Sequence, residues 1–414
     1  MIDKWHKRSA ADSFAPSVDK SLEATHRSVP VSQRTPRLSR VFHLRELTGL
    51  SISGVGPLFS IAATAGLFAQ KAGSFTLVAL LIIGLPFLCC SLVLRYLNQK
   101  LPQAGASYHW TRVIFGERAS ILQALVLTLG YFLSIAAIVV PAANYVLAIL
   151  DPSLQQSQLA QLSAAAVMLV LTGIVLCLGS KPVGWIIKIF LVIEGLALVG
   201  IIVLSLVHLF VHGLVNIHPH KMLQTQHNKS VGLSVPVFGI IVTAIMAAPI
   251  LDGWEVDSYA AEESILPRKD PGIGGIVGVT VSIVIYLVVF PLLFSQVSRH
   301  ILVGGGNPIV SWGAQIFPAD PSLLLLPIIT SACGVLLLIT YILSRALFSM
   351  GRDKILPNAF MHLSKKNVPS IIIITSLGAA LLVVCLEVFA ISLTGFFTMF
   401  LSSAGFFLNY YLAY

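Results

Sequence analysis

The sequence predicts an all-α protein that crosses a membrane many times, and two observations lead to this prediction. Of its 414 residues 56% are hydrophobic and only 10% are charged, whereas soluble domains carry roughly 25% charged residues. Apolar runs of about 20 residues, long enough to cross a bilayer as helices, recur along the chain. These runs lack the alternation of polar and apolar residues that a transmembrane β-barrel would show.

Ten spans are expected, with boundaries good to a few residues. They lie at about 46–69, 74–95, 119–150, 159–178, 183–210, 233–260, 272–297, 321–351, 370–386 and 389–414. Glu387 falls in the short gap before the tenth span. Because the chain stops at Tyr414, directly after that span, the sequence also fits a fragment of a longer protein.

The basic residues predict the orientation of these spans. With the N-terminus inside, every Lys and Arg except Lys71, Lys221, Lys229 and Arg299 falls on the inner side. The net charge of +9 is therefore explained by topology, and no nucleic-acid partner is expected. The predicted location is the plasma membrane or a bacterial inner membrane, with a cytoplasmic N-terminus.

The spans divide the chain into four expected parts. Residues 1–45 are polar and basic and lack the apolar core of a signal peptide, so they predict a disordered cytoplasmic tail that could contact anionic lipid. Residues 46–210 hold spans 1–5, 211–232 an extracellular loop, and 233–414 spans 6–10. All five cysteines lie in spans, so disulfides are not expected. Solvated histidines are favoured over a metal site at the outer loop, at His208, His212, His218 and His220.

Two spans contain helix breakers at matching places. Span 1 contains "SISGVGPLFS", with Gly54, Gly56 and Pro57 near its middle, and span 6 contains "PILDGWEVDSYAAEES", beginning at Pro249. Ten spans divide into two halves of five, and an odd repeat length inverts the second half. Interrupted helices that open both halves predict a substrate site near the middle of the bilayer.

Five motifs in order resemble the amino acid–polyamine–organocation (APC) superfamily, especially bacterial amino-acid permeases. The resemblance runs through nearly all of residues 46–414. The motifs are "GVG" from Gly54, "LPQAGASYHWTRVIFGE" from Leu101, "GWEVDSYAAEE" from Gly253, "NP" at Asn307 and "SRALFSMGRDKILP" from Ser344. Tyr96, where relatives often have an acid, and Asp252, where many have an apolar residue, depart from the pattern.

The resemblance implies the LeuT-type five-plus-five inverted repeat with discontinuous helices 1 and 6, alternating access and small amine-containing substrates. It also implies that span 1 amides take a substrate carboxylate and span 6 carbonyls its amino group. The substrate-binding residues carried over are Ser53, Gly54, Val55, Gly56, Pro57, Ala248, Pro249, Ile250, Leu251 and Asp252, with Trp254 as a candidate gate. Pro57 lacks an N–H group, so one donor of the usual set is missing.

Three charged residues have open alternatives. Asp252 either caps the second half of span 6, contacts a cationic substrate, or handles a proton. Glu255 either couples protons and gates or is stabilised by the helix dipole. Lys188 either faces the span 1 break, where relatives place a proton-carrying lysine, or extends to the inner surface.

Other polar groups bear on ion coupling. The span 8 positions that hold sodium in relatives match Cys333 and Gly334, which have no hydroxyl, although Thr330 and Ser331 are close. Protons are therefore favoured over sodium. Glu194 points away from Lys188 along the same helix, and the sequence assigns it no role.

The sequence thus predicts a secondary active transporter of amino acids, working by proton-coupled symport or by exchange. A polyamine or basic-amine transporter is the alternative, and a non-transporting membrane sensor is a remote one. No catalytic constellation is present, so an enzyme is not expected, and no organic cofactor is implied.

Overall fold

The computed structural model describes residues 37–212, 234–304, 306–316 and 320–389, and within these ranges it is nearly all helical. Nine segments there are long and apolar enough to cross a membrane, which confirms the predicted polytopic all-α class. Nearly all of the expected tenth span and residues 1–36 of the expected tail lie outside these ranges. The five-plus-five repeat therefore stays a prediction.

The helices α and 3-10 turns η follow the expected spans closely. Up to residue 212 they are α2 (Leu44–Val55), α3 (Pro57–Lys71), η1 (Gly73–Phe75), α4 (Thr76–Lys100), α5 (Ala106–Phe115), α6 (Glu117–Leu150), η2 (Pro152–Gln156), α7 (Gln158–Leu178) and α8 (Ser180–His212). From residue 234 they are α10 (Ser234–Ala247), η5 (Pro249–Leu251), α11 (Val256–Tyr259), η6 (Ala261–Glu263), α12 (Ile273–Gln296), α13 (Arg299–Val303), α14 (Pro308–Ile316), η7 (Pro321–Leu324), α15 (Leu325–Arg352), η8 (Asn358–Met361) and α16 (Ser370–Phe389).

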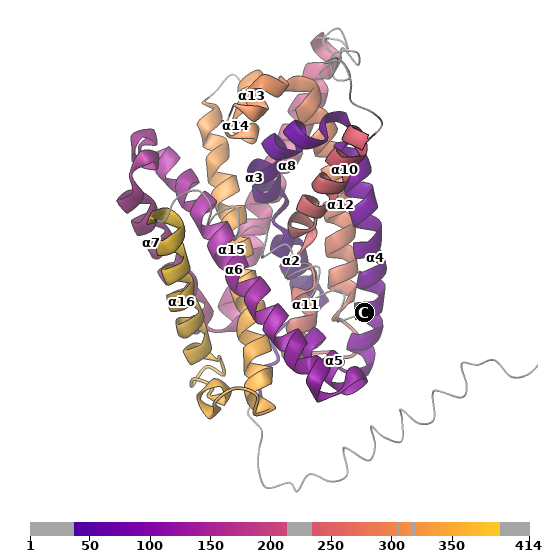
Figure 1. Cartoon of the computed structure of the whole chain (residues 1–414), viewed down its shortest axis with the longest axis vertical. Helices are drawn as coiled ribbons and strands as arrows, with labels where there is room; N and C mark the ends of the chain where they lie inside the picture. Colours follow the sequence, from indigo (N-terminus) through magenta and orange to yellow (C-terminus); the bar gives the residue numbers. More distant parts are fainter. Residues whose placement is uncertain (1–36, 213–233, 305, 317–319, 390–414) are drawn as a thin grey trace, which may run out of the picture. The chain divides into compact units, whose positions relative to one another are not determined.

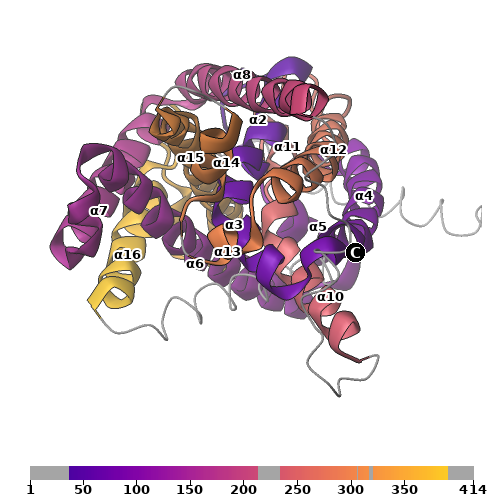
Figure 2. The ribbon, with the colours of Figure 1, turned by 90° about the horizontal axis from the view of Figure 1, so that it is seen from above.

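Span 1, formed by α2 and α3, lies at the centre of the packing. Its most apolar window is 78% buried, against 22% for that of α8, whose apolar side chains largely face outward. Figure 2 shows α3 enclosed by neighbouring helices, while α7 and α16 lie side by side at the edge. Helices α2 and α3 contact α15 and α12, so the interrupted span is held by protein on several sides.

Candidate functional site

Span 1 is broken at Gly56, as the sequence predicts. Helix α2 ends at Val55, Gly56 adopts left-handed backbone angles (φ 52°, ψ 64°), and α3 begins at Pro57. Left-handed backbone suits glycine, and proline fits the first helical position because its missing N–H would have no helical partner there. The break follows directly from the order of these two residues.

Span 6 is broken over a longer stretch. Helix α10 ends at Ala247, the turn η5 follows, and a single short helix, α11, begins at Val256. Asp252 has extended backbone angles, and Gly253 has φ 93°. The residue that flanks α11 at its start is Glu255, so Asp252 stands several residues before the second half-helix.

The two breaks touch each other through their backbones (Figure 1 shows α2 beside α11). A Cβ atom added to Gly54 would lie 2.3 Å from the carbonyl oxygen of Gly253, and one added to Gly253 would lie 2.4 Å from that of Gly54. No real side chain is accommodated at such distances. The two glycines therefore allow the interrupted spans to meet.

The structure brings the carried-over residues of both spans to this contact region. All are buried except the half-buried Pro249: Ser53, Gly54, Val55, Gly56, Pro57, Ala248, Ile250, Leu251, Asp252 and Trp254. The Trp254 ring lies against Gly275 of α12, where an added Cβ would come within 3.0 Å of it. Its packing partner is thus α12.

Glu255 is held by two groups near the second break. Its Oε2 accepts a hydrogen bond from the Gly253 N–H at 3.1 Å, and its Oε1 accepts one from the Tyr131 hydroxyl of α6. The Tyr131 ring meets Tyr259 edge-on, with 6.1 Å between centroids. Glu255 and Tyr131 therefore connect span 6 with span 3 beside the break.

Asp257 binds backbone N–H groups of the next span. Its Oδ2 accepts hydrogen bonds from the N–H groups of Gly272 and Gly275, at 2.6 and 2.8 Å. These donors lie at the start of α12, where a helix favours negative charge. Asp257 therefore joins the second half of span 6 to span 7.

Two polar groups lie at the start of α3: Glu194, to which the sequence assigned no role, and Ser331, which it named only as a hydroxyl close to the candidate sodium position. Glu194 of α8 accepts from the Leu58 N–H at 2.8 Å, and Ser331 of α15 accepts from the Phe59 N–H at 3.2 Å. The Ser331 hydroxyl also donates to Glu194 at 2.8 Å. A single carboxylate inside an apolar span was the available signal, since such groups are costly to bury without a role.

Lys188 does not lie at the span 1 break. Its Nζ is 2.6 Å from Glu46 Oε1, in the first turn of α2, and its side chain is 51% exposed. The sequence left two alternatives for Lys188, at the span 1 break or extending toward the inner surface. The structure places it near the end of the span. Six residues further along α8, Glu194 is the residue that reaches the break.

At the candidate sodium position, one of the two nearby hydroxyl groups lies beside span 1 and the other does not. Gly334 packs on Ser53, whose Oγ would lie 2.6 Å from an added Cβ, while Ser331 supplies the hydroxyl beside α3. Thr330 instead donates to the Pro327 carbonyl within its own helix. In the part of the chain that the structure describes, no three His, Cys, Asp or Glu side chains gather as metal ligands. His218 and His220 lie outside it.

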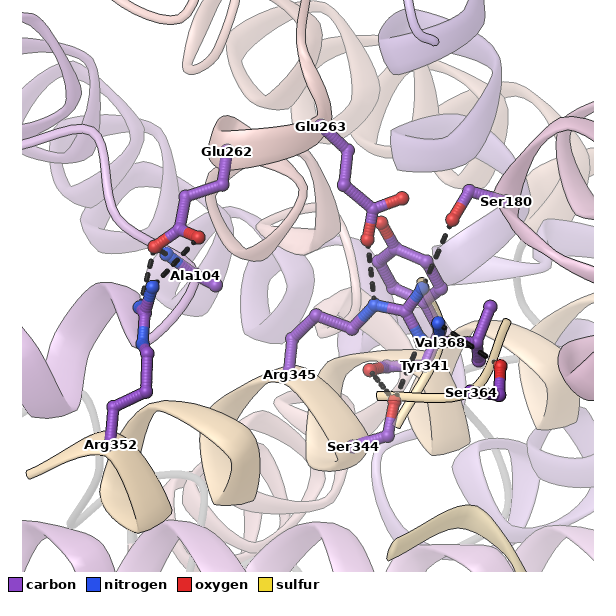
Figure 3. A network of polar contacts seen from close by, with 10 residues as sticks. All are labelled: Ala104, Ser180, Glu262, Glu263, Tyr341, Ser344, Arg345, Arg352, Ser364 and Val368. Carbon is purple, nitrogen blue, oxygen red and sulfur yellow. Dashed lines mark hydrogen bonds and ion pairs between the residues drawn. The ribbon is translucent and has the colours of Figure 1, made fainter. Parts of the chain in front are cut away.

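The paired acids after the second break bind two arginines of α15 (Figure 3). Glu263 accepts from Arg345 Nε at 2.9 Å, and both side chains are 1% exposed. Glu262 accepts from both terminal nitrogens of Arg352, at 2.5 and 3.0 Å. The arginines are seven residues apart, two helical turns, so they face consecutive acids from one side of α15.

The same acids hold the segment before span 1. The Glu263 carbonyl accepts from the N–H groups of Val41 and Phe42, and Phe42 in turn accepts from Ile265. Glu262 also accepts from the Ala104 N–H, at 3.0 Å, ahead of α5. Segments before spans 1, 3 and 7 and the end of span 8 therefore meet at η6.

Comparison with known proteins agrees with this architecture. The sequence profile of the family described as "Amino acid permease" matches residues 42–414. The methylthioribose transporter of Bacillus subtilis (strain 168) is 23% identical over 352 residues, which cover 80% of this chain and 72% of that protein. The chain therefore belongs to the amino acid permease family and is a membrane transporter.

Proposed function

We propose that this protein is a secondary active transporter that carries a small amine-bearing solute by alternating access at the two helix breaks. The observation that supports this proposal most is the backbone contact between Gly54 and Gly253, which brings two interrupted spans together. Interrupted helices expose polar backbone only where protein or a solute can satisfy it. A movement of either interrupted span at this contact changes the surface that the protein offers to the solute.

The solute-binding residues that we propose are those of the two breaks, Ser53–Pro57 and Ala248–Asp252, with Trp254 beside them. Asp252 and Glu255 are buried acids in this region. Acids beside exposed carbonyl groups favour a cationic nitrogen. This chemistry supports an amine, either of an amino acid or of a basic amine such as a polyamine.

Protons are the coupling ion that we propose, in symport, with exchange as the alternative. The support is the buried Glu255, whose carboxylate bridges Gly253 of span 6 and Tyr131 of span 3. Protonation would weaken its hold on both groups and so link proton binding to movement of the break. Lys188 pairs with Glu46 away from the break, so we give Glu255 this role first.

The orientation and the division into repeats remain part of the proposal. The basic residues favour a cytoplasmic side that includes η6 and η8, in a plasma or bacterial inner membrane. Residues 46–210 and 233–414 would form the two inverted repeats. The pairs Glu262–Arg352 and Glu263–Arg345 would then close the cytoplasmic end of the pathway.

A second candidate cargo is methylthioribose, which the Bacillus subtilis relative is named for. This sugar has hydroxyl groups but no amino and no carboxyl group. One feature of the chain supports it, because the N–H groups of Leu58 and Phe59 already have partners in Glu194 and Ser331. A membrane sensor that transports nothing remains the remote alternative.

Uptake into proteoliposomes tests the proposal. The panel is leucine, isoamylamine, ornithine, putrescine and methylthioribose, each with and without an inward proton gradient. Gradient-driven accumulation of an amine-bearing solute is expected, and Asp252→Asn should weaken uptake of the cationic members most. Uptake of the sugar alone would select the second candidate. No uptake and no exchange of any member would refute transport of these solutes.

A further inference from the structure

The first turn of α3 is a natural place to bind an anion, because a helix start carries N–H groups without helical partners and partial positive charge. In this protein each of those positions is already accounted for. Pro57 has no N–H, Leu58 donates to Glu194 at 2.8 Å, and Phe59 donates to Ser331 at 3.2 Å. The Ser60 N–H donates to the Gly56 carbonyl at 3.0 Å. No first-turn donor of α3 is left for a solute in this conformation.

Glu194 occupies the position of the anion. It comes from the middle of α8, far from α3 in sequence, and is 1% exposed. Its Oε1 accepts from both the Leu58 N–H and the Ser331 hydroxyl. Its Oε2 has no hydrogen-bond partner among the residues that the structure describes, although it is fully buried. This second oxygen can therefore accept from one more donor group.

Carboxylates also accept from backbone N–H groups near the second break. The Gly253 N–H, just before α11, donates to Glu255, and the N–H groups of Gly272 and Gly275, at the start of α12, donate to Asp257. The stretches Ser51–Ser60 and Ala248–Tyr259 contain no Lys and no Arg. A solute carboxylate at the breaks would meet carboxylates on several sides and no cationic side chain from these stretches, which is unfavourable in a buried site.

We infer that Glu194 fills the anion position at the start of α3, so that the solute bound at the breaks is one without a carboxylate. The inference rests on the proposed function and narrows its cargo to amines and neutral hydroxyl compounds. An ammonium or hydroxyl group of such a solute faces the Oε2 atom of Glu194. An amino acid is disfavoured because the site offers no partner for its carboxylate, whereas its amino group alone would find acceptors there.

Matched pairs of solutes test the cargo class in the unaltered protein. Ornithine differs from putrescine, and leucine from isoamylamine, by the carboxyl group. We measure the apparent affinity of each solute, both in uptake and in thermal stabilisation of the purified protein. The carboxylate-bearing member of each pair should bind at least about tenfold more weakly, because a tenfold difference in affinity corresponds to little more than one lost hydrogen bond. Stronger action of ornithine or leucine than of its partner would overturn the inference.

Chemical rescue tests the position of Glu194 without any transport. Glu194→Ala should lower the melting temperature, and added formate or acetate should raise it again by binding at the exposed helix start. Glu194→Gln keeps an accepting oxygen and should need no rescue. Glu387→Ala is the matched control, because Glu387 is a lone carboxyl in the apolar helix α16, whose main contacts are with α7, α6 and α15. Acetate should not restore that variant.

The outcomes separate the two proposals. Rescue of Glu194→Ala alone, with uptake of putrescine or isoamylamine, supports both. The same rescue with uptake of the sugar alone supports the anion position and selects the second candidate cargo. Rescue without uptake of any panel member refutes transport of these solutes while supporting the anion position. Equal stabilisation of the unaltered protein and Glu194→Ala by acetate would show that the position is open, and would overturn the inference. If Glu194→Ala does not fold, the solute pairs still decide it.

Discussion

The carbonyl oxygens of Gly54 and Gly253 each lie where the other residue would carry its Cβ, at 2.4 and 2.3 Å respectively from the added atom. The middle of span 1 and the middle of span 6 are therefore in direct backbone contact. Since Gly253 also has φ 93°, a side chain there would be strained even without a neighbour. This contact fixes how the two broken spans lie together.

Gly54→Ala is expected to abolish transport. The added methyl group requires the two backbones to separate, and backbone atoms cannot rotate out of the way as a flexible side chain can. Overpacking of this kind costs about 1–3 kcal/mol. The measurement is uptake per correctly folded protein, with folding followed by size-exclusion chromatography and thermal unfolding.

Gly195→Ala is the matched control for that variant. Gly195 lies within α8, and nothing comes within 4 Å of a Cβ added to it. Because alanine favours helix over glycine, this change should be neutral or stabilising by up to about 1 kcal/mol. Unchanged uptake by Gly54→Ala would contradict the importance of the contact.

The spans and both breaks could be predicted from the sequence because their signals are local. The length of an apolar run can be read directly from the sequence, and a glycine followed by proline interrupts a helix whatever surrounds it. The position of Gly56 between α2 and α3 follows from these two residues alone. The end of α4 at Lys100, beyond the expected 95, shows the usual uncertainty of boundaries.

The partners of the buried charges could not be predicted in the same way. Glu194 meets Leu58 across 136 residues, and which face of α8 turns inward depends on the packing of the bundle. The neighbouring Lys188 shares that helix but reaches Glu46 near its end. Likewise, the acid pair after span 6 was visible as a motif, while the sequence placed its arginines only on the inner side of the membrane.

Arg345→Met should be strongly destabilising. It would leave Glu263 buried without its cation, together with the loss of the Arg345 contacts to Ser180, Ser344 and the Tyr341 ring. Breaking a buried pair by removing one partner costs about 3–5 kcal/mol. The measurement is thermal unfolding of the purified protein in detergent.

The double variant Arg345→Met/Glu263→Gln serves as the control for this effect. It removes both charges, so it should recover part of the loss. Arg352→Met, at the more exposed Glu262 pair, should cost less than Arg345→Met. Equal losses in all three variants would mean that packing, and not charge burial, dominates at α15.

Acidic pH should weaken the end of the protein that contains α5. Burial lowers the pKa of His109, Arg352 and Arg112 lower it further, and Asp353 and Glu262 oppose them. The folded protein therefore favours neutral His109. Its contribution to stability is present above the unfolded pKa of about 6.5 and is lost as pH falls through and below that value.

Comparison with His109→Gln isolates this effect from other titrations. Between about pH 7.5 and pH 5.5 the melting temperature of the unaltered protein should fall more than that of the variant, because glutamine does not titrate. The measurement is the difference between the two pH profiles. Parallel profiles would show that protonated His109 is tolerated in the folded state.

Tyr131→Phe should reduce transport while leaving the fold intact. The change removes only the hydroxyl that donates to Glu255, and a hydrogen bond to a charged group contributes about 1.5–3 kcal/mol. Tyr145→Phe is the control on the same helix, because Tyr145 meets Phe59 through its ring, at 6.3 Å between centroids. Uptake is measured across a range of proton gradients, and equal effects of both changes would argue against a specific link to Glu255.

Lys188→Met should keep the stimulation of transport by a proton gradient. The ammonium of Lys188 meets Glu46 in a half-exposed pair, and such pairs contribute about 0–1 kcal/mol. Lys188 does not reach the break, where Glu194 and Ser331 accept from the first N–H groups of α3. Uptake with and without the gradient is compared for Lys188→Met and Glu255→Gln. Gradient dependence lost in Lys188→Met but kept in Glu255→Gln would return the coupling role to the lysine and contradict the role that we propose for Glu255.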